Sequence, residues 1–123
     1  MLIWALISLL FAVLAGSWLA VLHLSGRGPD RTPWPIAAVH AALALGGFGL
    51  LLVALSGPPR PVAGGTEGFA PAAALLLAVA ALFGAAILLR FRYRRKTATG
   101  LVGVHATLAV FGVVILAAYV LAG

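Results

Sequence analysis

The sequence predicts an all-α membrane protein, a transmembrane up-down-up-down bundle of four helices. Its 123 residues are 64% hydrophobic and only 8% charged. Soluble domains carry about 25% charged residues, so this chain lacks the polar surface that a water-soluble fold needs. The apolar residues fall into four runs, each long enough to cross about 30 Å of hydrocarbon at about 1.5 Å per residue.

The four runs together predict a single transmembrane domain over residues 1–123. No run contains an internal Asp, Glu, Lys or Arg, and all are rich in Ala, Gly and Leu, which let helices approach closely in lipid. The first run has no basic segment before it and is too long for a signal-peptide core, so we expect it to be a retained span. The expected helices are Leu2–Leu24, Trp34–Leu55, Phe69–Leu89 and Thr99–Leu121.

The connections between these runs are short. Residues 25–33 join the first two runs, the Pro/Gly-rich residues 57–68 join the middle two, and the basic residues 90–98 join the last two. Pro35 is well placed for the first turn of the second helix. Short connections make sequential helices antiparallel, which predicts the up-down-up-down topology.

The distribution of Lys and Arg predicts the orientation in the membrane. The second connection holds Arg60 alone, whereas the first and third hold seven basic residues: Arg27, Arg31, Arg90, Arg92, Arg94, Arg95 and Lys96. Basic residues favour the cytoplasmic side, so both termini are expected outside the cytoplasm, across a bacterial-type inner (plasma) membrane. Because the net charge of +6 sits in these short connections, it indicates topology and contact with the lipid bilayer, and no nucleic-acid partner.

The residue sets that enzymes most often use are missing. The chain has no cysteine, so a thiolate metal site and a cysteine nucleophile are excluded. No Ser/His/Asp set, carboxylate pair or phosphate-binding loop is present. Any catalysis would therefore be redox chemistry, and a non-catalytic electron-transfer subunit of an oxidoreductase is the stronger expectation.

Two histidines lie in a repeated pattern. The motif V-H-A-x-L-A-x-x-G occurs around His40 in the second run and around His105 in the fourth, 65 residues later. Both rings are expected about 7–8 Å inside parallel helices, at one depth in the cytoplasmic leaflet. The motif glycines Gly47 and Gly112 follow seven residues later, close to two turns on the same faces. Because glycine has no side chain, we expect these two residues to leave space beside any ligand that the histidines bind.

The expected spacing of these histidines favours a haem. Helices two and four should be diagonal partners in the bundle, about 11–14 Å apart. Two histidines bound to opposite faces of one haem iron need their backbones roughly that far apart, with each iron–nitrogen bond about 2 Å long. A zinc ion would need closer helices and two more ligands, which nothing at this depth supplies. His40 and His105 are therefore predicted as metal ligands of a bis-histidine haem.

With these paired histidines, the chain resembles the membrane b-type cytochromes, namely the cytochrome b561 class and each half of haem A synthase. The resemblance covers the whole chain as topology and the two histidine-centred stretches as motif. It implies low-spin haem b, one per chain, and electron transfer, with His40 and His105 as axial ligands. A second histidine pair at the outer ends of the helices is absent. We therefore expect the chain to pass electrons between a quinone or redox partner and other membrane subunits of a larger respiratory complex.

Other polar residues complete the expected site. Haem propionates would point towards the cytoplasmic edge, where the candidate arginines for them are Arg27, Arg31, Arg92, Arg94 and Arg95. His23 is a candidate for a second-shell donor, a proton carrier beside a quinone, or a histidine facing interfacial water. The aromatic residues Trp34, Tyr93 and Tyr119 are expected in the interfacial belts.

Three other functions are compatible with the sequence. A cofactor-free structural or assembly subunit would use His40 and His105 for hydrogen bonds between helices. A bacteriochlorophyll-binding subunit needs only one histidine per magnesium and no matched pair. A small channel or transporter should show broken helices or an intramembrane charge, and the sequence shows neither.

Overall fold

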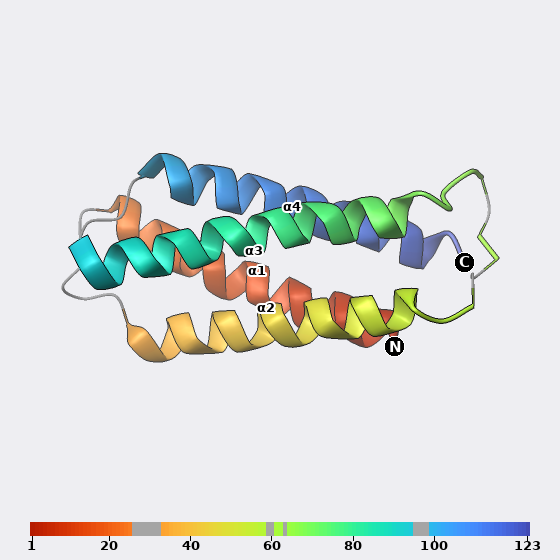
Figure 1. The fold of residues 1–123 in the computed structure, drawn as a ribbon, viewed down its shortest axis with the longest axis horizontal. Helices are drawn as coiled ribbons and strands as arrows, with labels where there is room; N and C mark the ends of the chain where they lie inside the picture. Colours follow the sequence, from red (N-terminus) through yellow and green to blue (C-terminus); the bar gives the residue numbers. More distant parts are fainter. Residues whose placement is uncertain (26–32, 59–60, 63, 95–98) are drawn as a thin grey trace.

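The computed structural model contains four long helices, which form an antiparallel bundle with both termini at one end (Figure 1). The structure describes residues 1–25, 33–58, 61–62, 64–94 and 99–123, although not the side chain of Arg94. The helices are α1 (Leu2–Leu24), α2 (Trp34–Leu55), α3 (Phe69–Arg94) and α4 (Thr99–Leu121). All four are long and apolar enough to cross a membrane, and they confirm the predicted all-α transmembrane bundle.

The chain forms helices because lipid offers no hydrogen-bond partner to the backbone, so each span must satisfy its own amide groups. The bounds of α1, α2 and α4 agree with the predicted runs. Pro35 lies in the first turn of α2, where its missing N–H leaves no bond unmade. In the connection between α2 and α3, Gly64 and Gly65 both take positive φ angles, of 71° and 73°, which glycine adopts without strain.

Helix α3 is longer than predicted. Its sequence-based end was Leu89, because the charged residues begin at Arg90, yet the helix continues through Arg94. No Gly or Pro interrupts this stretch, and cations at a helix C-terminus interact favourably with the helix dipole. Arg90, Arg92 and Tyr93 therefore extend beyond the apolar span on a helix and not on a turn.

The two ends of the bundle have different chemistry. We call the end that holds both chain termini and the connection between α2 and α3 the termini end. The opposite end, where α1 and α3 finish and α2 and α4 begin, is the basic end, because Arg90 and Arg92 lie there.

The bundle consists of two hairpins of similar construction. The most extensive contacts are within the α1–α2 hairpin and within the α3–α4 hairpin, and fewer join α1 to α4 and α2 to α3. This order makes α2 and α4 diagonal partners, as predicted. Helix α3 repeats the buried positions of α1 at an offset of 68 residues, and α4 repeats those of α2 at an offset of 65. The matching buried pairs are Ala5 and Ala73, Leu9 and Leu77, Ala12 and Ala80, Gly47 and Gly112, and Leu51 and Leu116.

The packed core occupies only the half of the bundle nearest the termini end. Its cluster includes Leu9, Leu51, Leu77 and Leu116. In the other half, no described side chain of residues 13–25, 33–46, 81–93 and 99–111 is buried. Figure 1 shows the physical reason, since α2 and α4 converge towards the termini end and diverge towards the basic end. Buried side chains thus join the two hairpins at one end only.

Gly47 and Gly112 hold each hairpin together within this packed half. A Cβ atom on Gly47 would lie 2.8 Å from Cγ of Leu9, and one on Gly112 would lie 2.8 Å from Cγ of Leu77. Lipid gives helices no hydrophobic reason to associate, so such close approaches supply much of the packing attraction. The sequence-based expectation put these glycines beside the histidines; the structure places them against the leucines of the neighbouring helix instead.

Substitution of Gly47 by alanine is expected to loosen the α1–α2 hairpin. We expect Gly47→Ala to lower the free energy of unfolding by about 1–3 kcal/mol, because the new methyl group overpacks the contact with Leu9. The adjacent Gly46 is a matched control, since a Cβ there meets nothing within 4 Å. Gly46→Ala should leave stability unchanged or raise it by up to about 1 kcal/mol. Unfolding by denaturing detergent in mixed micelles measures both, and equal effects of the two substitutions would contradict the packing described here.

Candidate functional site

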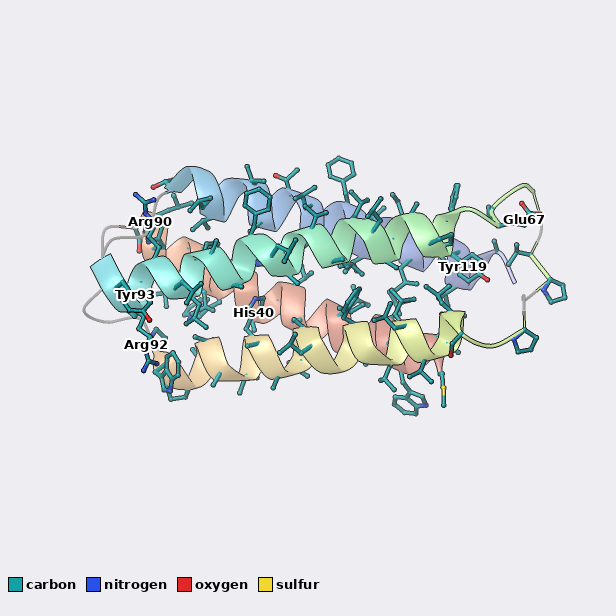
Figure 2. The ribbon with its side chains drawn as sticks, in the orientation of Figure 1. His40, Glu67, Arg90, Arg92, Tyr93 and Tyr119 are labelled. Atoms are coloured by element: carbon teal, nitrogen blue, oxygen red, sulfur yellow. The ribbon has the colours of Figure 1, made fainter. Side chains whose placement is uncertain are left out.

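His40 and His105 meet in the centre of the bundle. Each is the seventh residue of its helix, α2 or α4, and both are half-buried. Their ring centroids are 6.0 Å apart, with the ring planes at 81°. The expectation from sequence that the two rings share one depth therefore agrees with the structure. Figure 2 shows His40 in the interior of the bundle, on the side of the core nearest the basic end.

Each ring is fixed by the other helix of its own hairpin. Nδ1 of His40 lies 2.8 Å from the backbone oxygen of Ala12, and Nδ1 of His105 lies 2.7 Å from that of Ala80. A carbonyl oxygen only accepts, so each Nδ1 must be the protonated nitrogen that donates. In the neutral ring, Nε2 then keeps its lone pair and is able to bind a metal.

Two glycines make these hydrogen bonds possible. In a helix, the carbonyl of residue i points towards residue i+4, and side chains tilt back towards the N-terminus. A side chain at residue 16 or 84 would therefore cover the carbonyl of Ala12 or Ala80. A Cβ on Gly16 would lie 2.8 Å from Cε1 of His40, and one on Gly84 would lie 3.1 Å from Cε1 of His105.

Sequence reasoning did not find Gly16 and Gly84. They come from the helices that carry no motif histidine, so the V-H-A-x-L-A-x-x-G pattern does not include them. The available signal was a second repeat, in which Ala5, Leu9, Ala12 and Gly16 recur 68 residues later. That repeat would have linked α1 to α3 and pointed to both glycines.

Among the described residues, no third metal-binding side chain joins the two histidines. No cluster of three or more His, Cys, Asp or Glu side chains occurs within the described parts of the chain. His23 is half-buried in the last turn of α1, seven residues beyond Gly16 and so about 10 Å nearer the basic end. The protein thus offers two imidazole nitrogens and no third ligand from the described residues.

The predicted arginines are only partly described. Arg92 is exposed at the basic end of α3, and so is Arg90, which the sequence analysis did not include among the propionate candidates. Figure 2 shows Arg90 on the side of α4 and Arg92 on the side of α2. Arg27, Arg31, Arg95 and the side chain of Arg94 lie outside the described residues.

The aromatic residues at the basic end are exposed, as expected for an interfacial belt. Trp34 is 60% and Tyr93 is 78% exposed. Tyr119, at the other end of the bundle, was expected in the opposite belt but is only 7% exposed and belongs to the core. The turn of α4 in which it lies faces the other helices, which the hydropathy of the run alone did not indicate.

No protein-family model, curated protein or solved structure matches this chain.

The hydrogen bonds predict the tautomer of both histidines. When both imidazole rings are neutral and no cofactor is added, the ¹⁵N NMR signals of His40 and His105 should show Nδ1 protonated and Nε2 unprotonated. Gly16→Ala should disturb the tautomer of His40 and leave that of His105 unchanged, because its methyl group displaces only the ring in α2. Gly103→Ala is the control, since a Cβ at Gly103 meets nothing within 4 Å. An Nε2-protonated ring at both positions would contradict the site described here.

Proposed function

We propose that this chain is a membrane b-type cytochrome that binds one haem between its two hairpins, with His40 and His105 as axial ligands. The observation that carries the proposal is the pair of imidazoles 6.0 Å apart, each held through Nδ1. Two imidazoles on opposite faces of one iron, with bonds of about 2 Å, have ring centres about 6 Å apart. Any angle between the planes is compatible with this arrangement, including the observed 81°.

The number of ligands favours haem over a bare metal ion. Structural zinc takes four protein ligands and catalytic zinc usually three, whereas the described residues supply two. A haem brings four equatorial nitrogens of its own and needs only axial ligands from the protein. The hydrogen bond on the second ring nitrogen also fits, because metal-binding histidines commonly donate that N–H to a carbonyl or carboxylate.

The unpacked half of the bundle supports the same proposal. Buried side chains fill the half nearest the termini end, and none of the described ones is buried in the half that holds the histidines. Gly16 and Gly84 further reduce the side-chain volume beside the two rings. A flat cofactor between the hairpins would supply the packing that the side chains here do not.

The charge at the basic end suits the carboxylates of haem. Arg90 and Arg92 follow Gly84 by six and eight residues, which places their backbones about 9 and 12 Å nearer the basic end than the histidine level. Guanidinium groups bind carboxylates bidentately. Arg27, Arg31 and Arg94 are further candidates from the sequence.

Bound haem would supply one-electron redox chemistry. The chain's own residues would hold it in place: the histidines bind, and the carbonyls of Ala12 and Ala80 orient the rings and raise their basicity, which favours the oxidised metal. The site lies towards one end of the bundle, so a further redox centre or diffusible carrier is needed to move an electron across the membrane. We therefore propose a quinone or redox protein as the exchange partner, and a larger complex as the setting.

The histidine substitutions test this proposal. We expect His40→Ala and His105→Ala each to lower haem affinity by more than roughly tenfold, because loss of an outer-shell partner alone costs 10- to 100-fold at metal sites. His23→Ala should retain haem and its spectrum. Reduced-minus-oxidised visible spectra of the purified variants, with haem quantified as the pyridine haemochrome, measure the loss.

Two results would contradict the proposal. One is a wild-type haem spectrum in both His40→Ala and His105→Ala. The other is a colourless wild-type protein that loses stability in both variants, which would favour the cofactor-free structural subunit, with the histidines serving only as hydrogen-bond donors between helices.

The proposed orientation places the basic end in the cytoplasm. Seven Lys and Arg residues support this placement in a bacterial-type inner membrane, since they lie in the connection between α1 and α2, in the last turns of α3 and in the connection between α3 and α4. The connection between α2 and α3 holds Arg60 alone. Reporter enzymes that are active only outside the cytoplasm should therefore be active when fused to the C-terminus after Gly123 and inactive when inserted in the connection between α1 and α2. The reverse pattern would contradict the proposed orientation.

A further inference from the structure

A second candidate site lies at the termini end, away from the histidines. A cavity of about 230 Å³ opens there between the ends of all four helices. Most of the residues that form its walls are apolar, among them Leu2, Leu55 and Pro71, although about half of the wall surface is polar. Its polar side chains are those of Tyr119 and Glu67. Figure 2 shows Tyr119 and Glu67 at this same end. On α4, Tyr119 follows His105 by 14 residues, or about 21 Å, so this cavity is distinct from the histidine site.

Tyr119 has an unused hydrogen-bonding group in this cavity. The residue is 7% exposed, and its hydroxyl has no hydrogen-bond partner among the described residues. No fully enclosed side-chain oxygen or nitrogen in the described structure lacks a partner, so the hydroxyl itself is accessible. A ligand in the cavity that Tyr119 lines would accept a hydrogen bond from it.

The tyrosine is also a departure from the internal repeat. The offset of 65 residues relates Tyr119 to Ala54, and the offset of 68 relates Ala70 to Leu2; all four residues line the cavity. Several packing positions nearer the middle of the bundle keep the same residue in both hairpins, as at Leu51 and Leu116. Here the residues differ: α2 has Ala54 where α4 has Tyr119, and α3 has Ala70 where α1 has Leu2. The two alanines leave space for the cavity, and Tyr119 supplies a hydroxyl.

We infer that this cavity binds the head group of a quinone. A quinone ring suits apolar walls, and its carbonyl oxygen would accept a hydrogen bond from the Tyr119 hydroxyl. In the reduced form, a ring hydroxyl would donate to the carboxylate of Glu67, which is exposed at the same end. The cavity is too small for a haem. Electron exchange with the quinone rests on the proposed haem, whereas binding of the quinone in the cavity does not.

The two tyrosines of the chain allow a direct test, because Tyr119 lies in the cavity and Tyr93 is 78% exposed at the other end. The full chain, with ¹³C-labelled tyrosine rings, is titrated in detergent with a short-chain alkyl benzoquinone. The Tyr119 signal should shift and saturate, whereas the Tyr93 signal should follow only the gradual effect of quinone in the micelle. Equal, unsaturable shifts of both signals would overturn the inference.

Substitutions then test the hydrogen bond and the cavity separately. By calorimetric titration, Tyr119→Phe should weaken quinone binding roughly 3- to 10-fold, as expected for the loss of one net hydrogen bond. Tyr93→Phe should bind as the wild type does. Ala54→Leu, which fills the cavity from α2 and leaves the Tyr119 hydroxyl in the chain, should weaken binding at least as much. Wild-type affinity in both Tyr119→Phe and Ala54→Leu would overturn the inference.

His40→Ala separates this inference from the proposed haem. The variant should lose haem and still shift the Tyr119 signal with quinone at wild-type affinity. If quinone binds normally while the wild-type protein holds no haem, the proposed cytochrome function fails and the quinone site stands. If haem binds and Tyr119 does not respond, the quinone site fails alone.

Discussion

Two hydrogen bonds from histidine rings to helix carbonyls, His40 to Ala12 and His105 to Ala80, define the centre of this bundle. Hydrogen bonds between membrane helices average only about 0.6 kcal/mol, so their main effect is on position and not on stability. Each bond requires an exposed helix carbonyl, and each carbonyl is exposed because glycine stands four residues further on. The glycine, the carbonyl and the histidine thus form one unit that appears once in each hairpin. This unit turns both Nδ1 atoms towards helix carbonyls and leaves both Nε2 atoms without a hydrogen-bond partner among the described residues.

The repeated hairpin explains why the two halves of the bundle differ. Near the termini end, equivalent residues such as Leu51 and Leu116 meet and form the core. Near the basic end, the equivalent positions are the histidines and the glycines beside them, and the helices diverge. In the proposed function, a flat cofactor would lie between two related hairpins that pack together at one end and diverge at the other. At the far end of the core, the exchange of Ala54 for Tyr119 removes the equivalence and leaves a cavity with one hydroxyl.

Much of the fold could be predicted from the sequence because bilayer thickness fixes the length of an apolar run. The bounds of α1, α2 and α4 followed from hydropathy alone, whereas α3 continued past its apolar run through Arg94 because nothing in that stretch breaks a helix. The two histidines were predicted at one depth from their equal distance to the helix starts. The neighbours of each ring were not predictable in the same way. They depend on how α1 and α2 are aligned along each other, and no pattern within a single helix shows this alignment. For this reason Gly47 was expected beside the His40 ring, whereas the structure places Gly16 there.

The most direct test of the central claim is the amount of haem in the wild-type protein, purified from haem-replete cells and measured together with its reduced-minus-oxidised visible spectrum. The account predicts sharp α and Soret bands that correspond to about one haem per chain, held by two imidazoles. A folded protein without these bands, purified with its native partners, would contradict it. The histidine pair would then serve only to hold each hairpin together.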